Sequence, residues 1–240
     1  MRCATEHSIF TCTNELGTAI IAVHVDDMPV TASSPSAMIA AKATLQKYFK
    51  IIDLRPVKWL LGICIERDCC NHTIALSQMA YIESIVTRFK IEDAFKVKTP
   101  MDTNVTLSKR LSPLSDKEKT RMENIPYLSA VGSLMYVSMA TRPNITYAVS
   151  HLGKYFSNPG QAHWTAAQHV IHYLNGTCNQ RLVLGGKQPI ALHGHVDLDF
   201  PQDLDDRKSV SGYSFNLGSG AILWSSKKQA TVAGSSMEAE

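Results

Sequence analysis

The sequence lacks the marks of a secreted or membrane-bound protein. No apolar run approaches the roughly 18 residues of a membrane span, and the first residues lack the basic-then-apolar order of a secretory signal. The six cysteines show neither a Cys-x-x-Cys pair nor zinc-knuckle spacing, which argues against a disulfide framework and against a structural zinc site. We therefore expect an intracellular protein with reduced thiols, in the cytoplasm or the nucleus and away from membranes.

A strong charge of either sign is also missing. The 24 basic and 21 acidic residues leave a net charge of +3. Nucleic-acid binding usually needs a clustered basic face rather than a mild excess, so charge alone does not indicate a ligand. With 45% hydrophobic residues in 240, the chain can bury a sizeable core in one or two domains.

The first feature that points to chemistry is the acidic pair Asp26-Asp27, which ends the apolar run 19–25. This run predicts a buried strand, and unpaired charges buried at its end would cost several kcal/mol unless something positive compensates. Carboxylate oxygens suit Mg²⁺, and two such ions about 3.5–4 Å apart commonly serve phosphoryl transfer. The alternative is an ordinary Asp-Asp turn after a strand, and the dipeptide alone does not decide between them.

The first hundred residues predict a strand, a helix, a hairpin and a second helix. Ser34 and Pro35 are typical of a helix start. The predicted apolar face of this helix comprises Met38, Ala41, Leu45 and Phe49, and that of the second helix comprises Ile82, Ile85, Val86 and Phe89. Between the helices, 63–66 and 73–76 flank a polar link and predict the hairpin.

From 99 to 124 the chain is polar, and we predict a surface linker. Helices follow, with one apolar face at Ile145, Val149, Leu152 and Phe156, and another at Trp164, Ala167, Ile171 and Leu174, before Gly176 as a predicted C-cap. His163, His169 and His172 fit surface or capping positions better than a metal site, because no Cys or acidic ligand accompanies them. Strands are predicted at 181–184, 190–196, 213–217 and 221–225, with a tight turn at 218–220.

Short motifs occur in a consistent order along nearly the whole chain. They are His24-Val25-Asp26-Asp27-Met28, Lys58-Trp59-Leu60-Leu61-Gly62-Ile63-Cys64-Ile65, Ser77-Gln78 with Tyr81-Ile82 and Arg88-Phe89, Lys98-Thr99-Pro100-Met101, Ala130-Val131-Gly132-Ser133-Leu134-Met135-Tyr136, Ala140-Thr141-Arg142-Pro143, Asp205-Asp206-Arg207-Lys208-Ser209 with Ser211-Gly212-Tyr213, Trp224-Ser225-Ser226-Lys227-Lys228-Gln229, and Ser235-Ser236-Met237-Glu238-Ala239-Glu240. Each motif alone is weak. Together they resemble the Pol polyprotein of copia-type LTR retrotransposons.

The resemblance implies an α+β fold, with a partial reverse-transcriptase palm and thumb followed by an incomplete ribonuclease H-like α/β domain. The implied segments are 1–98 for the end of the palm plus the thumb, 99–124 for a linker, 125–180 for a helical connection and 181–240 for the truncated ribonuclease H-like domain. From the residues alone, an ordinary α+β domain would produce the same order of elements.

The resemblance also implies the site residues. The catalytic residues and Mg²⁺ ligands would be Asp26, Asp27, Asp197 and Glu238, with Ser235 or Ser236 capping the helix of Glu238. Nucleic-acid contacts would be made by Trp59, Gly62, Lys227 and Lys228, although a paired lysine is as often part of a solvated loop. The implied partners are an RNA:DNA hybrid or other nucleic acid and the remainder of the Pol polyprotein.

Some positions depart from the family pattern. His24 replaces a Tyr, and Pro29 stands where the strand after the acidic turn should continue, which is tolerated only at a strand edge or start. Arg55 and Lys90 each replace a Gly and would be strained wherever the backbone needs a positive φ. Phe200 and Pro201 replace a Trp-Ala pair.

Three hypotheses follow. The first, which we favour, is a Pol fragment inactive by itself, because the upstream palm Asp and the later ribonuclease H acids are missing from this sequence. The second is a residual enzyme, either a nuclease using Asp197, Asp199 and Glu238 or a polymerase completed by a second chain. The third is a non-catalytic protein that grips an RNA:DNA duplex through its phosphates.

Overall fold

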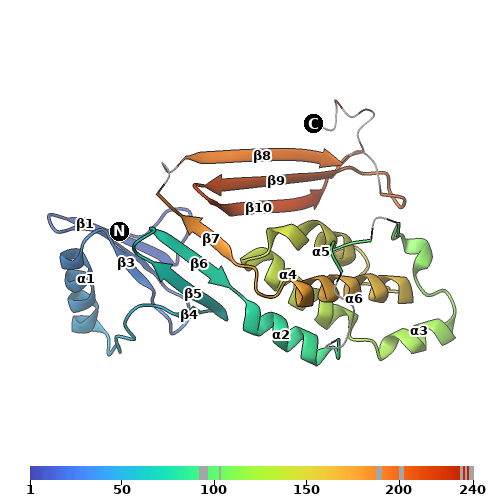
Figure 1. Cartoon of the computed structure of the whole chain (residues 1–240), viewed down its shortest axis with the longest axis horizontal. Helices are drawn as coiled ribbons and strands as arrows, with labels where there is room; N and C mark the ends of the chain where they lie inside the picture. Colours follow the sequence, from blue (N-terminus) through green and yellow to red (C-terminus); the bar gives the residue numbers. More distant parts are fainter. Residues whose placement is uncertain are drawn as a thin grey trace. The chain divides into compact units, whose positions relative to one another are not determined.

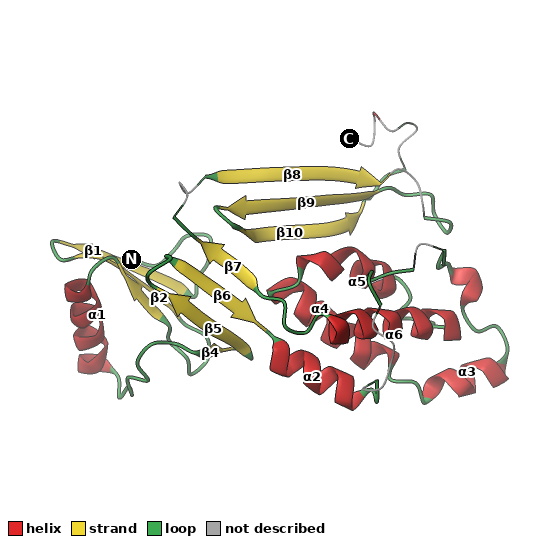
Figure 2. Ribbon diagram, in the orientation of Figure 1, coloured by secondary structure: helices red, strands yellow, loops and turns green. Residues whose placement is uncertain are grey.

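The chain divides into two compact units, Met1–Val57 and Lys58–Glu240 (Figure 1). The computed structural model describes residues 1–91, 97–102, 104–187, 191–199, 203–232, 235 and 237. Across these ranges, no helix combines the length and the apolar character needed to cross a bilayer. The α+β class is confirmed, because both units mix helices with antiparallel sheet (Figure 2).

The first unit is a small sheet with one helix. Strands β1 (Ile9–Asn14), β2 (Gly17–Ala22) and β3 (Val30–Ala32) form an antiparallel sheet in the order β1-β2-β3. Helix α1 (Pro35–Tyr48) follows, and its N-cap Ser34 accepts a hydrogen bond from the Ala37 backbone N–H at 3.1 Å. The predicted helix start is therefore confirmed.

The predicted apolar face of α1 is only partly covered. Met38, Ala41 and Leu45 are half-buried, whereas Phe49 lies beyond the helix end and is exposed. Further exposed apolar side chains follow in the segment 48–54. Packing within the first unit therefore leaves much of this segment in contact with solvent.

A four-stranded sheet opens the second unit. It contains β4 (Trp59–Leu60), β5 (Ile63–Asp68), β6 (Thr73–Ser77) and β7 (Leu182–Gly185), in the order β4-β5-β6-β7. The predicted hairpin of β5 and β6 is confirmed. The strand predicted at 181–184 was assigned, with the later strands, to the segment 181–240, but this strand, β7, pairs with β6 instead. The sequence does not reveal that pairing, because it joins segments more than a hundred residues apart and leaves no local pattern.

Four helices enclose the main core of this unit: α2 (Met79–Arg88), α4 (Tyr127–Ala140), α5 (Thr146–Gly153) and α6 (Gln161–Gly176). The predicted stripes of α2, α5 and α6 do face this core, since their central side chains are almost completely buried. The fully buried members include Ile82, Ile85, Tyr127, Leu134, Ile145, Leu152, Ile171 and Leu174. Helix α6 ends on Thr177 as its C-cap, one residue beyond the predicted Gly176.

The polar segment 99–124 contains more structure than a plain linker. Leu107 is buried with the helical core, and a 3-10 turn, η1, spans Lys109–Leu111. Helix α3 (Asp116–Glu123) then begins with a capping box between Ser115 and Glu118. A second 3-10 turn, η2 (Pro143–Ile145), precedes α5.

The last sheet consists of β8 (Leu192–Asp199), β9 (Val210–Leu217) and β10 (Gly220–Lys228) in the order β10-β9-β8. Gly218, with φ of +64°, forms the predicted tight turn between β9 and β10. The same glycine makes an isolated parallel bridge to Gly185 at the end of β7. The two sheets of this unit therefore meet at these glycines.

The histidine prediction holds in part. His163 does act as a cap, since its Nδ1 accepts the Gly160 N–H at 2.8 Å, but it is completely buried and stacks on Tyr155 at 3.9 Å. Of the two predicted alternatives, surface or capping, His163 therefore takes the capping position. His169 is half-buried, and its Nε2 lies 3.0 Å from the Thr99 carbonyl oxygen.

Candidate functional site

The acidic pair lies at the tip of a hairpin whose turn has two central residues. The register of β2 and β3 continues beyond the strands, because the Ala22 N–H donates to the Pro29 carbonyl at 3.1 Å. His24 and Asp27 then exchange two backbone hydrogen bonds of 2.9 Å each. Val25 and Asp26 are consequently the two central residues of the turn. We call residues 22–29 the acidic hairpin.

Both carboxylates of the acidic hairpin face solvent. Asp26 and Asp27 are exposed, and within the described part of the chain no group donates a hydrogen bond or forms an ion pair with either carboxylate. The expectation of charges buried at a strand end is therefore corrected, and no burial penalty arises. Two adjacent, unpaired carboxylates remain free to bind a hard cation.

The turn is strained at Val25. Its φ is +52°, in the left-handed region that glycine favours, and its side chain is 84% exposed. A β-branched residue in this region costs on the order of 1–3 kcal/mol and persists only where its surroundings impose it. Strain of this kind concentrates at functional sites, and here it lies beside the acidic pair.

Pro29 occupies the kind of position predicted for it. It immediately precedes β3, which is an edge strand of the first sheet. Its carbonyl joins the hairpin ladder by accepting the Ala22 N–H, whereas its missing N–H leaves out the reciprocal bond to the Ala22 carbonyl. The proline is thus compatible with an intact acidic hairpin.

The hairpin of β4 and β5 carries two of the predicted nucleic-acid residues. Leu61 and Gly62 form its turn, with φ of +51° and +74°. The Tyr136 hydroxyl donates to the Leu61 carbonyl, which ties the turn to α4. Trp59 is 58% exposed and lines a hollow of about 250 Å³ together with Met79. Its indole is therefore accessible to a stacking partner.

Asp197 lies on β8 at the wall of a groove of about 310 Å³. The groove runs between the sheet of β8, β9 and β10 and the start of α5, and His195, Ser214 and Trp224 also line it. The Asp197 carboxylate is exposed and accepts the Leu198 N–H at 2.8 Å. Glu238 and Ser236 lie outside the described residues.

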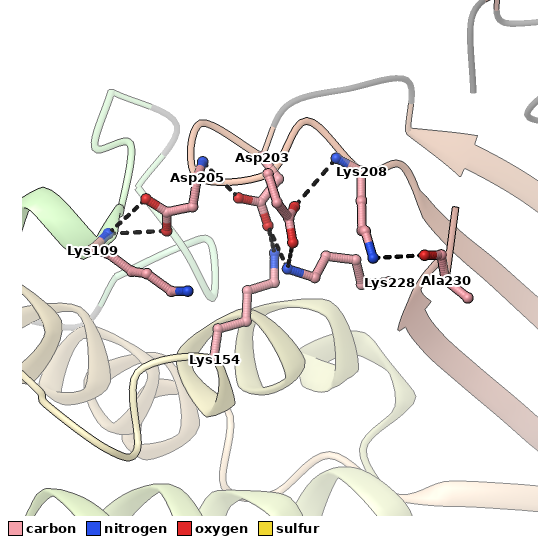
Figure 3. A network of polar contacts seen from close by, with 8 residues as sticks. Lys109, Lys154, Asp203, Asp205, Lys208, Lys228 and Ala230 are labelled. Atoms are coloured by element: carbon pink, nitrogen blue, oxygen red, sulfur yellow. Dashed lines mark hydrogen bonds and ion pairs between the residues drawn. The ribbon is translucent and has the colours of Figure 1, made fainter. Parts of the chain in front are cut away.

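Lys227 and Lys228 have different surroundings. Lys227 is exposed, whereas the Lys228 ammonium lies 2.6 Å from Asp206 and 3.2 Å from Asp203 (Figure 3). Asp203 also binds Lys154 at 2.9 Å, and its side chain is only 3% exposed. The Lys228 charge is thus neutralised within the chain, while Lys227 presents its charge to solvent.

Asp203 stays ionised despite its burial. Burial alone would raise the pKa of its carboxyl, but hydrogen bonds from Lys154 and the Asp205 backbone outweigh that effect and hold the pKa well below the usual range. Nearby, burial and the Lys154 charge lower the pKa of His151 to about 4, so this imidazole is neutral at pH 7.

Asp205 extends the network to a distant segment. Both of its carboxylate oxygens accept the Lys109 backbone N–H at 2.9 Å, at the start of η1. The sequence predicts no role for Asp203, Lys154 or Lys109, because these partners are 49 to 96 residues apart in the chain. The only local signal was the acidic motif itself.

Metal-binding capacity is limited in what the structure describes. Across these ranges, no three His, Cys, Asp or Glu side chains converge to hold an ion. Asp26 and Asp27 belong to the first unit, and Asp197 belongs to the second. The six cysteines are all free thiols, as the sequence predicted.

The chain is similar to several known proteins, and these similarities identify its family. A family model described as reverse transcriptase (RNA-dependent DNA polymerase) matches residues 1–103. A retrovirus-related Pol polyprotein from transposon TNT 1-94 of Nicotiana tabacum is 41% identical over 221 residues, which cover 92% of this chain and 17% of that protein. The putative transposon Ty5-1 protein of Saccharomyces cerevisiae is 31% identical over 93% of this chain and 70% of its own length. The chain belongs to the copia-type retrotransposon Pol family.

A second Pol polyprotein, from transposon RE1 of Arabidopsis thaliana, is 34% identical over 98% of this chain and 16% of that protein. The chain therefore spans about a sixth of the length of these two Pol polyproteins. No solved structure matches it. Within this Pol chain, the reverse-transcriptase match includes the acidic hairpin and the Trp59 hairpin, whereas Asp197 and Lys227 lie beyond it.

Proposed function

We propose that the acidic hairpin supplies two metal-binding carboxylates to the RNA-directed DNA polymerase of a Pol polyprotein. The observation that supports this proposal is the pair of unpaired, exposed carboxylates at a strained hairpin tip, inside the segment that matches reverse transcriptases. Asp26 and Asp27 would hold Mg²⁺, whose charge would assist phosphoryl transfer when bound.

The remaining residues would position nucleic acid. Trp59 offers an exposed indole for stacking on a base or sugar. Gly62 lets the neighbouring turn approach a backbone closely, because it has no side chain and its φ is positive. Lys227 offers an uncompensated charge for phosphates, whereas Lys228 is already paired with carboxylates.

A second candidate activity is ribonuclease H-like cleavage of an RNA:DNA hybrid. Asp197 favours it, since its exposed carboxylate lines a groove beside His195. In this proposal, 1–98 is the palm end and thumb, 99–124 a linker, 125–180 the connection and 181–240 the nuclease-like part. Because β7 pairs with β6, strand 182–185 ties that last part to the thumb region.

We further propose that the 240-residue polypeptide alone does not polymerise DNA. Two-metal sites need carboxylates from separate elements, and the described residues bring no third acid to the acidic hairpin. The third ligand would come from the remainder of the Pol polyprotein. The same polypeptide would still bind an RNA:DNA duplex through Trp59 and Lys227.

One assay tests both activities. A labelled RNA template with a DNA primer is incubated with Mg²⁺ and either the 240-residue polypeptide or a longer Pol polypeptide that contains it, and both primer extension and RNA cleavage are followed. We expect extension only by the longer polypeptide, with a loss of at least about 100-fold in Asp27→Asn. RNA cleavage that disappears in Asp197→Asn would support the nuclease candidate, and no cleavage above a denatured control would remove it.

The control is Asp116→Asn, the same chemical change at an exposed carboxylate on α3. It should leave extension and cleavage unchanged. Undiminished extension in Asp27→Asn would contradict the polymerase proposal. Extension by the 240-residue polypeptide itself would contradict the claim that it is inactive alone.

A further inference from the structure

Strand β8 forms the outer edge of the last sheet (Figure 1). The Gly218 N–H donates to the Ala191 carbonyl at 3.1 Å, in line with the register that pairs Leu192 with Leu217. Hydrogen bonding alternates along an antiparallel pair, so the odd-numbered residues of β8 bond to β9. The N–H and C=O groups at 192, 194, 196 and 198 therefore point to the open edge.

Within the described residues, this edge lacks several of the usual protections against pairing with another strand. Natural proteins shield edge strands with charged side chains, lysine above all, or with proline, a bulge, very short length or a covering element. Strand β8 has eight residues, contains neither lysine nor proline, and keeps an unbroken register with β9. One outward donor, the Leu198 N–H, is satisfied only by the carboxylate of its neighbour Asp197. The edge is thus suited to accept an additional strand.

Two copies of β8 have complementary side chains when they lie antiparallel with Val196 of one copy opposite Val196 of the other. In that register His195 lies opposite Asp197 of a second copy, and Gly194 lies opposite its Leu198. The sequence repeats the pattern with His at 193 and Asp at 199. If His195 lay on the two-fold axis, it would face His195 of the second copy. If Asp197 lay on the axis, it would face Asp197 of the second copy. An imidazole can donate a hydrogen bond to a carboxylate, whereas two carboxylates repel each other, so this complementarity favours the register centred on Val196.

Hydrogen-bond geometry agrees with this register. Val196 points its backbone groups outward, so two copies can exchange a reciprocal pair of hydrogen bonds at the symmetry axis. His195 and Asp197 then form pairs without backbone hydrogen bonds, in which opposing side chains approach each other most closely. The favourable imidazole–carboxylate pairs therefore fall at the positions where opposing side chains are closest.

The face of the sheet that carries Gly194, Val196 and Leu198 also favours association. It is apolar yet exposed, with Leu192 at 63% and Val196 at 77% accessible. The Phe215 ring lies over Gly194, since a Cβ placed there would come within 2.6 Å of the ring. Leu198 of a second copy, opposite Gly194, would pack against that ring, and the two Val196 side chains would lie side by side.

We propose that two copies of this chain associate through β8, antiparallel and two-fold symmetric about Val196. The association joins two three-stranded sheets into one of six strands. It is independent of the polymerase proposal, because it uses no metal and no nucleic acid, but it engages Asp197, on which the nuclease candidate also depends. The interface is limited to one strand pair and its flanking side chains, so we expect a dissociation constant on the order of 10–100 µM.

Sedimentation equilibrium of the 240-residue chain, from about 1 to about 300 µM, tests the proposal. His195→Asp sets carboxylate against carboxylate and should weaken the dimer at least about 10-fold. The exchanged variant His195→Asp/Asp197→His restores the pairing of an imidazole with a carboxylate and should return the dissociation constant to within about 3-fold of the original. Val196→Pro removes an outward N–H without removing a bond to β9, and should abolish the dimer.

The matched control is His72→Asp, which makes the same charge change in an exposed turn of the β5–β6 hairpin. It should not alter association. A chain that stays monomeric throughout the range overturns the proposal. A dimer equally stable in His195→Asp, or one that the exchanged variant fails to restore, overturns it as well.

Discussion

At the scale of single residues, backbone strain is concentrated at a few positions. Val25, Arg55 and Lys90 all have φ between +52° and +67°. The prediction that Arg55 and Lys90 stand where glycine is preferred is confirmed in this respect. Only Val25 lies beside the acidic pair, so its strain has a functional interpretation, whereas the other two are costs without an evident compensating contact.

Replacing these two residues by glycine should stabilise the protein. Arg55→Gly and Lys90→Gly each remove side-chain strain at positive φ, while the local backbone bonds from Arg55 to Asp53 and from Lys90 to Thr87 remain. We expect a gain of about 0.5–1 kcal/mol in the free energy of unfolding for each, measured by thermal or urea denaturation. The control Lys47→Gly, within α1, should lose about 1 kcal/mol. An unchanged or lower stability in both glycine variants would refute the strain argument.

At the scale of elements, the loop 203–209 holds separate segments together. Asp203 binds Lys154 near the end of α5 and Lys228 on β10, while Asp205 binds the backbone of Lys109 (Figure 3). Removing one member of a buried ion pair leaves an uncompensated charge. The loop is therefore a structural tie between the helical core and the last sheet.

Asp203→Asn should destabilise the second unit by about 2–4 kcal/mol at pH 7, because Lys154 and Lys228 lose their buried counter-charge. The pKa of Asp203 is lowered in the folded state, so its contribution is fully present above the pKa of about 3.9 in the unfolded chain. It is lost as the pH falls from there through the folded pKa. The difference between the two proteins, followed by urea denaturation against pH, should therefore shrink below about pH 4.

The comparison for this experiment is Asp116→Asn, whose exposed partner Lys119 lies 3.5 Å away. An exposed pair is screened by water, so this variant should change stability little at any pH. Equal effects of the two variants would mean that Asp203 makes no special contribution.

The helices and strands also differ in how well the sequence predicts them. The strands of the β5–β6 hairpin and the buried stripe of α2 were predictable, because both patterns are local. Helix α3 was missed, although its capping box of Ser115 and Glu118 is visible in the sequence, because the segment around it is polar. The β6–β7 pairing was missed because it joins segments more than a hundred residues apart.

The candidate site was likewise predicted only in part from the sequence. Asp26 and Asp27 were found because they are adjacent within one motif. Their exposure was not foreseen, since an apolar run does not distinguish a buried strand end from a solvated hairpin tip. The partners of Asp203 lie on α5 and β10 and come together only in the folded unit.

At the scale of the whole molecule, the chain combines a reverse-transcriptase segment with a helical core and a last sheet. The two units contain different candidate acids, Asp26 and Asp27 in one and Asp197 in the other. We propose that the chain is one part of a Pol protein, in which the acidic hairpin contributes ligands to a metal site that other segments complete. Association through β8 would add a second copy at the opposite edge from β10.

The most direct test of this account is NMR of the 240-residue chain during titration with Mn²⁺, which broadens signals near its binding site. We predict selective broadening of the backbone amides of residues 24–28 at millimolar Mn²⁺, and its loss in Asp26→Asn/Asp27→Asn. The acidic pair Asp205-Asp206 is an internal control, because its carboxylates are already engaged and nearby amides should stay sharp. Equal broadening at both pairs, or none at the acidic hairpin, would contradict the claim that Asp26 and Asp27 form a metal-binding element.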